Sequence, residues 1–450
     1  MRKNWSILAG ILICVQVFLA CSDSVSSSTT SSIVDEIEKS GSHDVTHPKD
    51  STRSDTTAQK EPVVPDTTAT PDTTAPEESI DPDTTPKLDT IPHYAVIEDS
   101  CGLHFTLGEN DITAGNLYLN YPADSFLTRF EVGDIATVAI VGYDTLEMPV
   151  AESTNDIPIS WFLLAAIKGY DKLVLSIHYG QLAEILGITA EKAPIEVIVS
   201  MKEKGGYLLG LDIMRNTQYL DTYTESYPDL SIEDFANFRE VRTTGMGKNK
   251  LYRSSSPIYL YLGRNYYADS LAKEAGVATF INLTDSEDNA YAYKGFDTSY
   301  YSSQDIVFLS MPTEFFAKPF KEGLVKGFRY MIEHESPYLV HCTYGMDRTG
   351  FTIAVLEALM GATAVEIQAD YAKTFSNYFH VQDGKQIALT EQQVDFFKAV
   401  VLRNLRAVYH AEEIEVPKTD DADWATATEN YLKKLGMTTQ EISDLKDKLK

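Results

Sequence analysis

The chain has 450 residues, of which 43% are hydrophobic and 23% are charged, so it is long enough to bury one or more ordinary cores. Its formal net charge is −28 at pH 7. This acidity argues against a nucleic-acid partner, because a phosphate backbone is bound by a basic face. With only four cysteines, two of them near the N-terminus, the chain does not have the composition of a disulfide scaffold.

The N-terminus has the pattern of an export signal. Residues 1–21 read MRKNWSILAGILICVQVFLAC, with a basic start, an apolar run and a small residue before Cys21. Residues 1–20 are therefore expected to be a signal peptide. A Cys directly after a small residue resembles a bacterial lipoprotein cleavage box, which implies that Cys21 is lipidated and anchors the chain to a membrane of the cell envelope, on its periplasmic or outer face. The alternative is plain secretion, with Cys21 incidental.

Residues 21–90 are expected to form a disordered linker behind that anchor. They are rich in Ser, Thr, Asp and Pro, and the tetrapeptide PDTT occurs three times, at 65–68, 71–74 and 82–85. Such a segment has too few apolar side chains to offset the entropy lost on folding. We expect it to hold the rest of the chain away from the membrane.

Residues 91–214 are predicted to form a small β-rich accessory domain. Stretches rich in β-branched residues at 130–143, 171–180 and 193–201 favour strands, and residues 159–170 are predicted to form a helix. This region shows no catalytic pattern. Cys101, His104 and His178 are scattered and are interpreted as packing or surface residues.

Residues 215–450 alternate between predicted strands and helices, which favours an α/β domain with a mostly parallel central sheet flanked by helices. Thr438 and Glu441 form a capping box before the last helix. The expected strands are 277–285, 305–312 and 337–342, and the expected helices are 319–335, 349–362, 389–410 and the two halves of 430–449.

Residues 341–350, HCTYGMDRTG, join a predicted strand to a predicted helix through a loop. Backbone amides of such a loop, together with the helix N-terminus, can form a nest for an anion. Gly345 lets the backbone come close to the anion, Gly350 lets the helix start tightly, and Arg348 offers a fork for two phosphate oxygens. Cys342 lies at the base of the loop, where the same groups stabilise a thiolate.

The pattern therefore predicts a phosphoryl group held above a nucleophilic sulfur, with a phosphocysteine intermediate that water hydrolyses. Thr349 is expected to hydrogen-bond the departing sulfur, and His341 to order the loop. Neither a metal nor another cofactor is needed for this chemistry. The predicted phosphate-binding residues are Thr343, Tyr344, Gly345, Met346, Asp347 and Arg348.

The loop resembles the His-Cys-x5-Arg-Ser/Thr-Gly motif of the cysteine-dependent protein tyrosine phosphatases, in a dual-specificity-like bacterial branch. The segments NFREV (237–241), LYRSSSP (251–257) and INLTDSED (281–288), and the C-terminal tail, resemble the same branch, so the likeness covers roughly residues 215–450. It implies a structural or pocket-rim role for Arg253. The alternative is that Arg239 and Arg253 are surface charges.

One position departs from that branch, whose loop carries a Lys where this chain has Met346. The missing cation weakens the case for inositol phosphates or phosphoinositides and favours phosphotyrosine. Tyr344 adds an aromatic side chain that could contact a substrate ring or fill space.

A general acid must protonate the leaving oxygen. Asp347, inside the loop, is favoured, and the bacterial branch uses the Asp at that position. Glu314 and, less favoured, Asp285 follow other predicted strands. Asp347 could instead cap the following helix, and Glu314 could be merely solvated.

Three functions stay open from the sequence. The first is a phosphatase acting on phosphotyrosine in a protein or peptide, or also on phosphoserine and phosphothreonine. The second is a phosphatase acting on an inositol phosphate, a phosphoinositide or another small phosphomonoester. The third is a membrane-anchored binding lipoprotein whose β-rich domain docks a partner.

Overall fold

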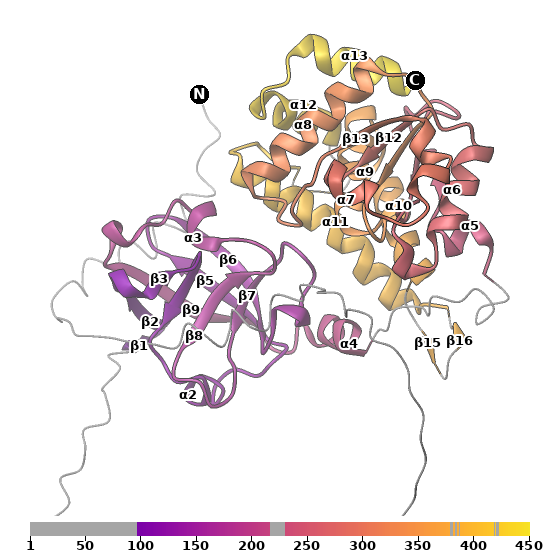
Figure 1. Ribbon diagram of the computed structural model, residues 1–450. Coiled ribbons are helices and arrows are strands. Elements are labelled where there is room, and N and C mark those ends of the chain that lie inside the picture. Colours follow the sequence, from indigo (N-terminus) through magenta and orange to yellow (C-terminus); the bar gives the residue numbers. More distant parts are fainter. Residues whose placement is uncertain are drawn as a thin grey trace, which may run out of the picture. The chain divides into compact units, whose positions relative to one another are not determined.

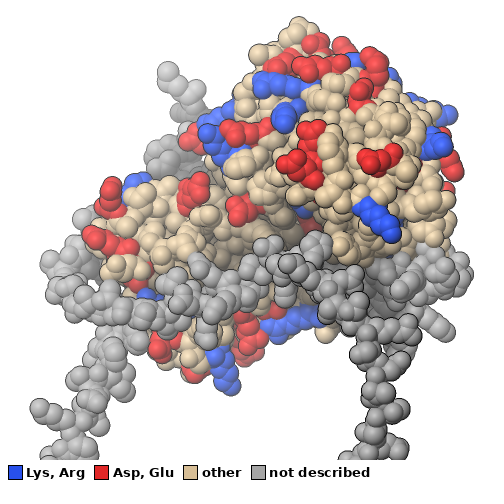
Figure 2. All heavy atoms as spheres, in the orientation of Figure 1, with Lys and Arg blue, Asp and Glu red and all other residues tan. Residues whose placement is uncertain are grey.

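The computed structural model describes residues 97–216, 230–378, 381–382, 385–386, 388–417, 419 and 423–450. The predicted signal peptide, the lipidation of Cys21 and the linker up to residue 90 lie outside the described residues and stay predictions. Among the described helices, none combines the length and the apolar character that a membrane span needs. On the face shown in Figure 2, basic and acidic side chains are interspersed rather than gathered into one basic face.

The first part of the described chain is a sheet of nine strands in the order β1-β2-β9-β5-β6-β7-β8-β4-β3. Neighbouring strands pair antiparallel except β6 and β7, which are parallel. The strands are β1 (Ile97–Asp99), β2 (Gly102–Leu107), β3 (Ile112–Thr113), β4 (Asn116–Leu119), β5 (Ile135–Ile140), β6 (Asp144–Ala151), β7 (Phe162–Ala165), β8 (Leu173–Ile177) and β9 (Ile195–Glu203). This agrees with the β-rich character predicted from the sequence.

The predicted helix at 159–170 is wrong, because the segment contains strand β7. Leu163 and Leu164 are fully buried, and β7 pairs with β8 through four residues on each strand. A continuous apolar run carries neither the period of a helix nor that of a strand, so it does not distinguish a buried strand from a buried helix. Short helices α2 (Ala123–Phe126), α3 (Leu182–Ile185) and α4 (Leu208–Asn216) complete this part.

The second sheet has five strands in the order β10-β11-β14-β12-β13. Strands β11, β14, β12 and β13 are parallel, and only β10 runs antiparallel to its neighbour, which confirms the predicted mostly parallel sheet. The strands are β10 (Arg239–Glu240), β11 (Leu251–Ser254), β12 (Thr279–Asn282), β13 (Asp305–Phe308) and β14 (Tyr338–His341). A two-stranded ribbon, β15 (Val381–Gln382) and β16 (Lys385–Gln386), lies further along the chain.

Helices cover both faces of this sheet (Figure 1). Phe280 of β12 belongs to a buried cluster with Ala268 and Ala272 of α6, whereas Ile281 lies against Gly327 of α8 on the other face. The helices are α5 (Ile232–Phe235), α6 (Asn265–Glu274), α7 (Glu287–Tyr291), α8 (Lys318–Glu333), α9 (Asp347–Met360), α10 (Ala364–Tyr378), α11 (Glu391–Ala411), α12 (Trp424–Lys434) and α13 (Thr439–Leu449).

Helix α9 is the central helix of this part of the chain. It contacts β14, α10, α11 and α12, and its side chains are buried on every side from Thr349 to Met360. The helix ends at Gly361, which has a φ of 91°, as a C-terminal glycine stop requires. The predicted capping box of Thr438 and Glu441 is present at the start of α13.

The parallel register brings three strand ends to one place. His341, the last residue of β14, pairs with Ser254 at the end of β11 and with Asn282 at the end of β12. Because parallel strands end at the same edge of a sheet, the loops after these strands meet there, which is the usual location of ligand sites in open α/β sheets. The loop of residues 342–346 is the one that leads from β14 into α9.

Candidate functional site

The carbonyl groups of the loop after β14 are held on its outer side. Ser256 N donates to Thr343 O at 3.1 Å. Asn237 Nδ2 donates to Tyr344 O at 3.3 Å and to Gly345 O at 3.1 Å. In a planar trans peptide the N–H points opposite to the C=O, so the amides of residues 344, 345 and 346 point away from these partners and towards the inner side of the loop. That side also faces the free amides of the first turn of α9.

Gly345 is required by the way the loop lies against strand β11. It has a φ of 66°, and a Cβ atom there would lie 2.1 Å from Ser254 O. A side chain would therefore push the loop off the strand. The predicted reason was a close approach to an anion, but the structure shows that the close approach is to the chain's own backbone. Gly350 is similarly confined, with a Cβ position 2.6 Å from the Tyr371 ring.

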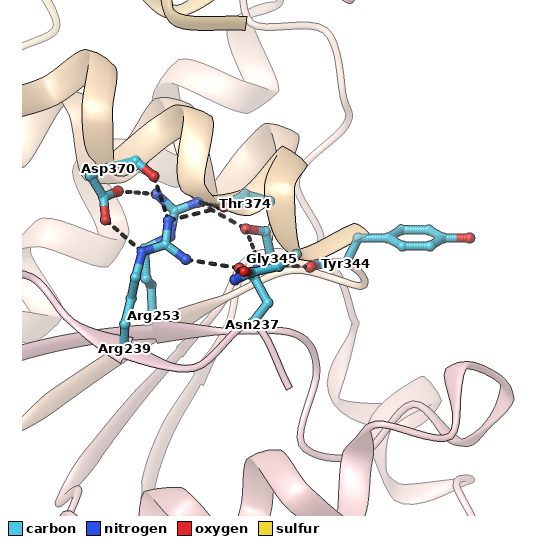
Figure 3. Close-up of polar contacts among 8 residues, drawn as sticks. Asn237, Arg239, Arg253, Tyr344, Gly345, Asp370 and Thr374 are labelled. Atoms are coloured by element: carbon cyan, nitrogen blue, oxygen red, sulfur yellow. Dashed lines mark hydrogen bonds and ion pairs between the residues drawn. The ribbon is translucent and has the colours of Figure 1, made fainter. Parts of the chain in front are cut away.

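A buried network of two arginines lies beneath the loop (Figure 3). Arg253 is fully buried, and its Nη2 donates to Gly345 O at 2.9 Å. Arg253 also forms an ion pair with Asp370. Arg239 Nε donates to the same carboxylate at 2.7 Å, and Arg239 Nη1 donates to Asn237 Oδ1 at 2.8 Å. The alternative that these arginines are surface charges is therefore wrong, since both connect α10 to the loop.

The two guanidinium groups of this network share one carboxylate. Burial by itself would raise the pKa of Asp370, but the two guanidinium groups hold that pKa below its ordinary value, so Asp370 is an anion. Burial raises the pKa of nearby Glu357 well above its usual range, which disfavours the charged form of that carboxyl. Arg239 and Arg253 both pair with the one carboxylate of Asp370, so the two guanidinium groups beneath the loop favour an anion above it.

His341 begins the loop and is fixed by a second buried network. Its ring is fully buried, which lowers the pKa of His341 to about 3, so the imidazole is neutral. The Tyr301 hydroxyl lies 3.1 Å from His341 Nε2, and Asn282 Nδ2 donates to the Tyr301 hydroxyl at 3.0 Å. Asn282 Nδ2 also donates to Asp285 Oδ2 at 3.0 Å. These contacts connect the start of the loop to β12 and to the segment that contains Tyr301, and the ordering role of His341 stays a prediction.

Arg348 and Thr349 lie in the first turn of α9. Arg348 Nη1 donates to Met311 O at 2.9 Å, which ties the guanidinium to the segment after β13. The Thr349 hydroxyl is buried and has no hydrogen-bond partner among the described residues. A buried hydroxyl without a partner is costly, so this group is available to a ligand held beside Cys342. Cys342 itself is only 3% exposed.

The three candidate acids differ in their surroundings. Burial raises the pKa of Asp347 to about 6, against a smaller opposing effect of Arg348. Asp285 is 5% exposed and accepts a hydrogen bond from the Tyr293 hydroxyl at 3.2 Å, and burial raises its pKa as well. Glu314 is partly exposed and follows Met311, the contact of Arg348. Of the three, Asp347 is nearest to the loop in the sequence, because it is the first residue of α9.

Tyrosines line the rim beside the loop. Tyr344 is 36% exposed, and its ring points away from the arginine network in Figure 3. Its ring lies 5.9 Å from that of Tyr378. Tyr259 packs edge-to-face against Tyr293, with ring centroids 5.8 Å apart, and Tyr293 in turn contacts Asp285. Aromatic faces at a site favour flat apolar ligand groups.

The structure brings together most of the residues that the sequence singled out. His341, Cys342, Thr343, Tyr344, Gly345, Met346, Asp347, Arg348 and Thr349 form one continuous turn from β14 into α9. Sequence reasoning missed the residues that hold this turn: Asn237, Tyr301, Asn282 and Asp370. Asn237 and Asn282 lie within segments that resembled known motifs, whereas Tyr301 and Asp370 gave no signal. No group of residues suited to a metal ion occurs in the described part of the chain.

Taken together, the loop offers inward amides, a helix N-terminus and a guanidinium around one cysteine, above two buried guanidinium groups. Such a cradle can hold a tetrahedral oxyanion over the Cys342 sulfur. Asp347, a half-buried acid whose pKa is raised to about 6, begins the helix that follows this loop.

Comparisons with known proteins agree with this geometry. Residues 230–450 match the model of the tyrosine phosphatase family. The matched residues lie within the region, roughly 215–450, for which the sequence resembles the tyrosine phosphatases. No curated protein matches the chain.

Two solved structures are similar to parts of the chain. One is an uncharacterized conserved protein from Thermotoga maritima, with 20% identity, a TM-score of 0.20, and coverage of 23% of this chain and 37% of that one. The chain therefore spans little more than a third of that relative. The other is the core catalytic domain of the PP-IP phosphatase SIW14 from S. cerevisiae in complex with citrate, with 19% identity and a TM-score of 0.23. The match covers 38% of this chain and 93% of that one.

The arginine network gives a prediction about anion binding. Replacing Arg253 with Lys (Arg253→Lys) removes the planar fork that joins Gly345 O to Asp370. We expect the affinity for tungstate, measured by calorimetry, to fall about tenfold to a hundredfold, because the loop amides lose their fixed direction. The matched control is Arg242→Lys, whose side chain is 65% exposed and pairs with Glu240. A folded Arg253→Lys protein with unchanged affinity would contradict this role.

Proposed function

We propose that the chain is a cysteine-dependent phosphatase that hydrolyses phosphomonoesters, with phosphotyrosine in a protein or peptide as its preferred substrate. The observation that carries the proposal is the outward anchoring of the carbonyls of Thr343, Tyr344 and Gly345, which turns the intervening amides towards the space above Cys342. Amides already turned inward stabilise the transition-state oxygens without reorganisation when the reaction occurs. The family match of residues 230–450 supports the same conclusion.

In the first step, the Cys342 thiolate attacks phosphorus in line with the ester bond. The S–P bond forms as the P–O bond breaks, and the bond pair goes to the ester oxygen, which takes the proton of Asp347. Arg348 and the loop amides hold the three remaining phosphoryl oxygens. The product is a phosphocysteine and a free alcohol or phenol.

In the second step, water attacks phosphorus and the S–P bond breaks. Asp347, now a carboxylate, accepts the proton of the water, and the electron pair returns to sulfur. The Thr349 hydroxyl, which has no hydrogen-bond partner among the described residues, donates a hydrogen bond to the sulfur as it leaves. Inorganic phosphate is released, and the thiolate is restored.

Two features of the site support an aromatic monoester over a polyphosphorylated substrate. Met346 is buried and apolar at the loop position that could otherwise carry a second cation. Arg239 and Arg253 share the carboxylate of Asp370 beneath the loop, and Arg348 is the cation in the first turn of α9. The rim of Tyr344 and Tyr259 offers ring faces to a phosphotyrosine side chain.

The first test uses p-nitrophenyl phosphate in the presence of a chelator. Wild-type protein should release nitrophenol, and Cys342→Ser should lower kcat at least about a thousandfold, since the oxygen nucleophile is far less reactive. Release of nitrophenol by Cys342→Ser at the wild-type rate would overturn the proposal. Cys101→Ser, remote in sequence and partly exposed, is the matched control.

The assignment of Asp347 gives a pH prediction. Burial raises its pKa to about 6, so the protonated acid is fully present below that pH and is lost as the pH rises through it. For a phosphotyrosyl peptide, kcat should therefore fall on the alkaline side of about pH 6. Asp347→Asn should abolish this decline and lower kcat by roughly 10²–10⁴.

The same variant should lose much less activity towards p-nitrophenyl phosphate, because nitrophenolate leaves without protonation. Glu314→Gln is the control and should keep the alkaline decline. If Asp347→Asn keeps it and Glu314→Gln or Asp285→Asn loses it, the general acid is one of those residues instead.

Met346 gives a prediction about substrate choice. Met346→Lys adds a cation to the loop and should raise phosphate release from a myo-inositol polyphosphate about tenfold, with little change for a phosphotyrosyl peptide. Met346→Leu, which keeps the volume without the charge, is the control. A wild-type enzyme that already prefers the inositol polyphosphate would contradict the proposed substrate class.

A further inference from the structure

Strand β13 leaves one edge of the five-stranded sheet without a neighbouring strand among the described residues (Figure 1). On its inner side, Asp305 N donates to Ala278 O at 3.2 Å and Leu309 N donates to Asn282 O at 2.9 Å. Hydrogen bonding alternates along a strand, so odd-numbered residues face β12 and the backbone groups of Ile306 and Phe308 face outward. These N–H and C=O groups form a short row of donors and acceptors open to a second chain.

A groove of about 740 Å³ follows this free edge. Its lining includes Ile306 and Phe308 of β13, the aromatic residues Tyr291 and Phe296, Lys326 of α8, and the acidic residues Glu287 and Asp297. Tyr291 is 55% exposed, and its ring lies edge-to-face with that of Phe308 at 6.0 Å. The groove therefore offers aromatic surfaces for side chains next to a row of backbone groups.

The groove ends at Ser310, one residue before a contact of the candidate active site. The strand β13 runs parallel to β14, so its carboxyl end lies at the same sheet edge as the loop of Cys342. Ser310 N donates to Asp285 O at 3.2 Å, and the next residue, Met311, accepts the hydrogen bond of Arg348. A strand added beside β13 would lie about 14 Å from β14, a distance that a phosphotyrosine side chain and a few further residues can span.

We infer that an extended segment of the phosphorylated polypeptide substrate pairs with the free edge of β13 and so guides its phosphotyrosine into the loop of Cys342. This inference rests on the proposed phosphatase function and adds the place on the fold where the polypeptide substrate binds. The occupant is an extended chain because backbone groups at this spacing are what a second strand binds. The continuity of the groove with the contact of Arg348 identifies that chain as the substrate.

The test is Ile306→Pro, which removes the outward N–H at a position where the sheet itself loses no hydrogen bond. KM for a phosphotyrosyl peptide of about ten residues should rise about fivefold, the effect of one lost hydrogen bond, with kcat unchanged. Kinetics with p-nitrophenyl phosphate should stay at the wild-type level. Ile306→Ala keeps the N–H and is the matched control, and it should raise KM less than the Pro variant.

A second measurement avoids any effect of Pro on folding. Peptides N-methylated at successive single positions on each side of the phosphotyrosine are assayed with wild-type protein, and methylation at alternate positions should raise KM. Equal KM values for all methylated peptides would overturn the inference. The inference would also be overturned if wild-type protein were a dimer and Ile306→Pro were a monomer with an unchanged KM. The edge of β13 would then bind a second copy of the chain.

The two proposals fail in different ways. If the phosphatase function is wrong, wild-type protein turns over neither substrate. If only the docking inference is wrong, wild-type protein turns over both substrates, and Ile306→Pro leaves both unchanged.

Discussion

The candidate site depends on how the Gly345 carbonyl is held. Arg253 and Asn237 both donate to this oxygen, at 2.9 and 3.1 Å, from segments on the outer side of the loop. Since the peptide is planar, fixing the carbonyl also fixes the direction of the following N–H. Under the proposed function, an anion meets amides whose direction is already fixed, and this preorganisation is what makes oriented amides effective in catalysis.

This arrangement requires charges to be buried. Removing a guanidinium or carboxylate from water costs several kcal/mol, and good hydrogen bonds repay the cost only in part, so the network of Arg239, Arg253 and Asp370 is a weak argument for stability. The effect of this network on the position of the loop is clearer than its effect on stability. The network connects β10, β11 and α10 to the loop and places two guanidinium groups beneath it. On the other side, hydrogen bonds connect His341 at the start of the loop to Tyr301 and Asn282, and Asn282 in turn donates to Asp285.

The loop itself could be predicted from the sequence because its parts are contiguous. Cys342, Arg348 and Gly350 stand at a fixed spacing between an apolar strand and an apolar helix, and backbone geometry then decides the rest. The residues that hold the loop in position could not be predicted in the same way. Asn237 lies 108 residues from Gly345, and Tyr301 lies 40 residues from His341, so only the folded sheet brings each pair together. The parallel sheet was recognised from the alternation of strands and helices, whereas β7 was mistaken for a helix because its apolar run has no period.

The central claim is that the loop holds a phosphoryl group directly on the sulfur of Cys342. The most direct measurement is a rapid acid quench of wild-type protein reacting with p-nitrophenyl phosphate, followed by mass spectrometry of its peptides. The account predicts a phosphoryl group on the peptide that contains Cys342, appearing before free phosphate and disappearing as the substrate is consumed. A phosphoryl group on a different residue, or turnover with no phosphorylated peptide at any quench time, would contradict it.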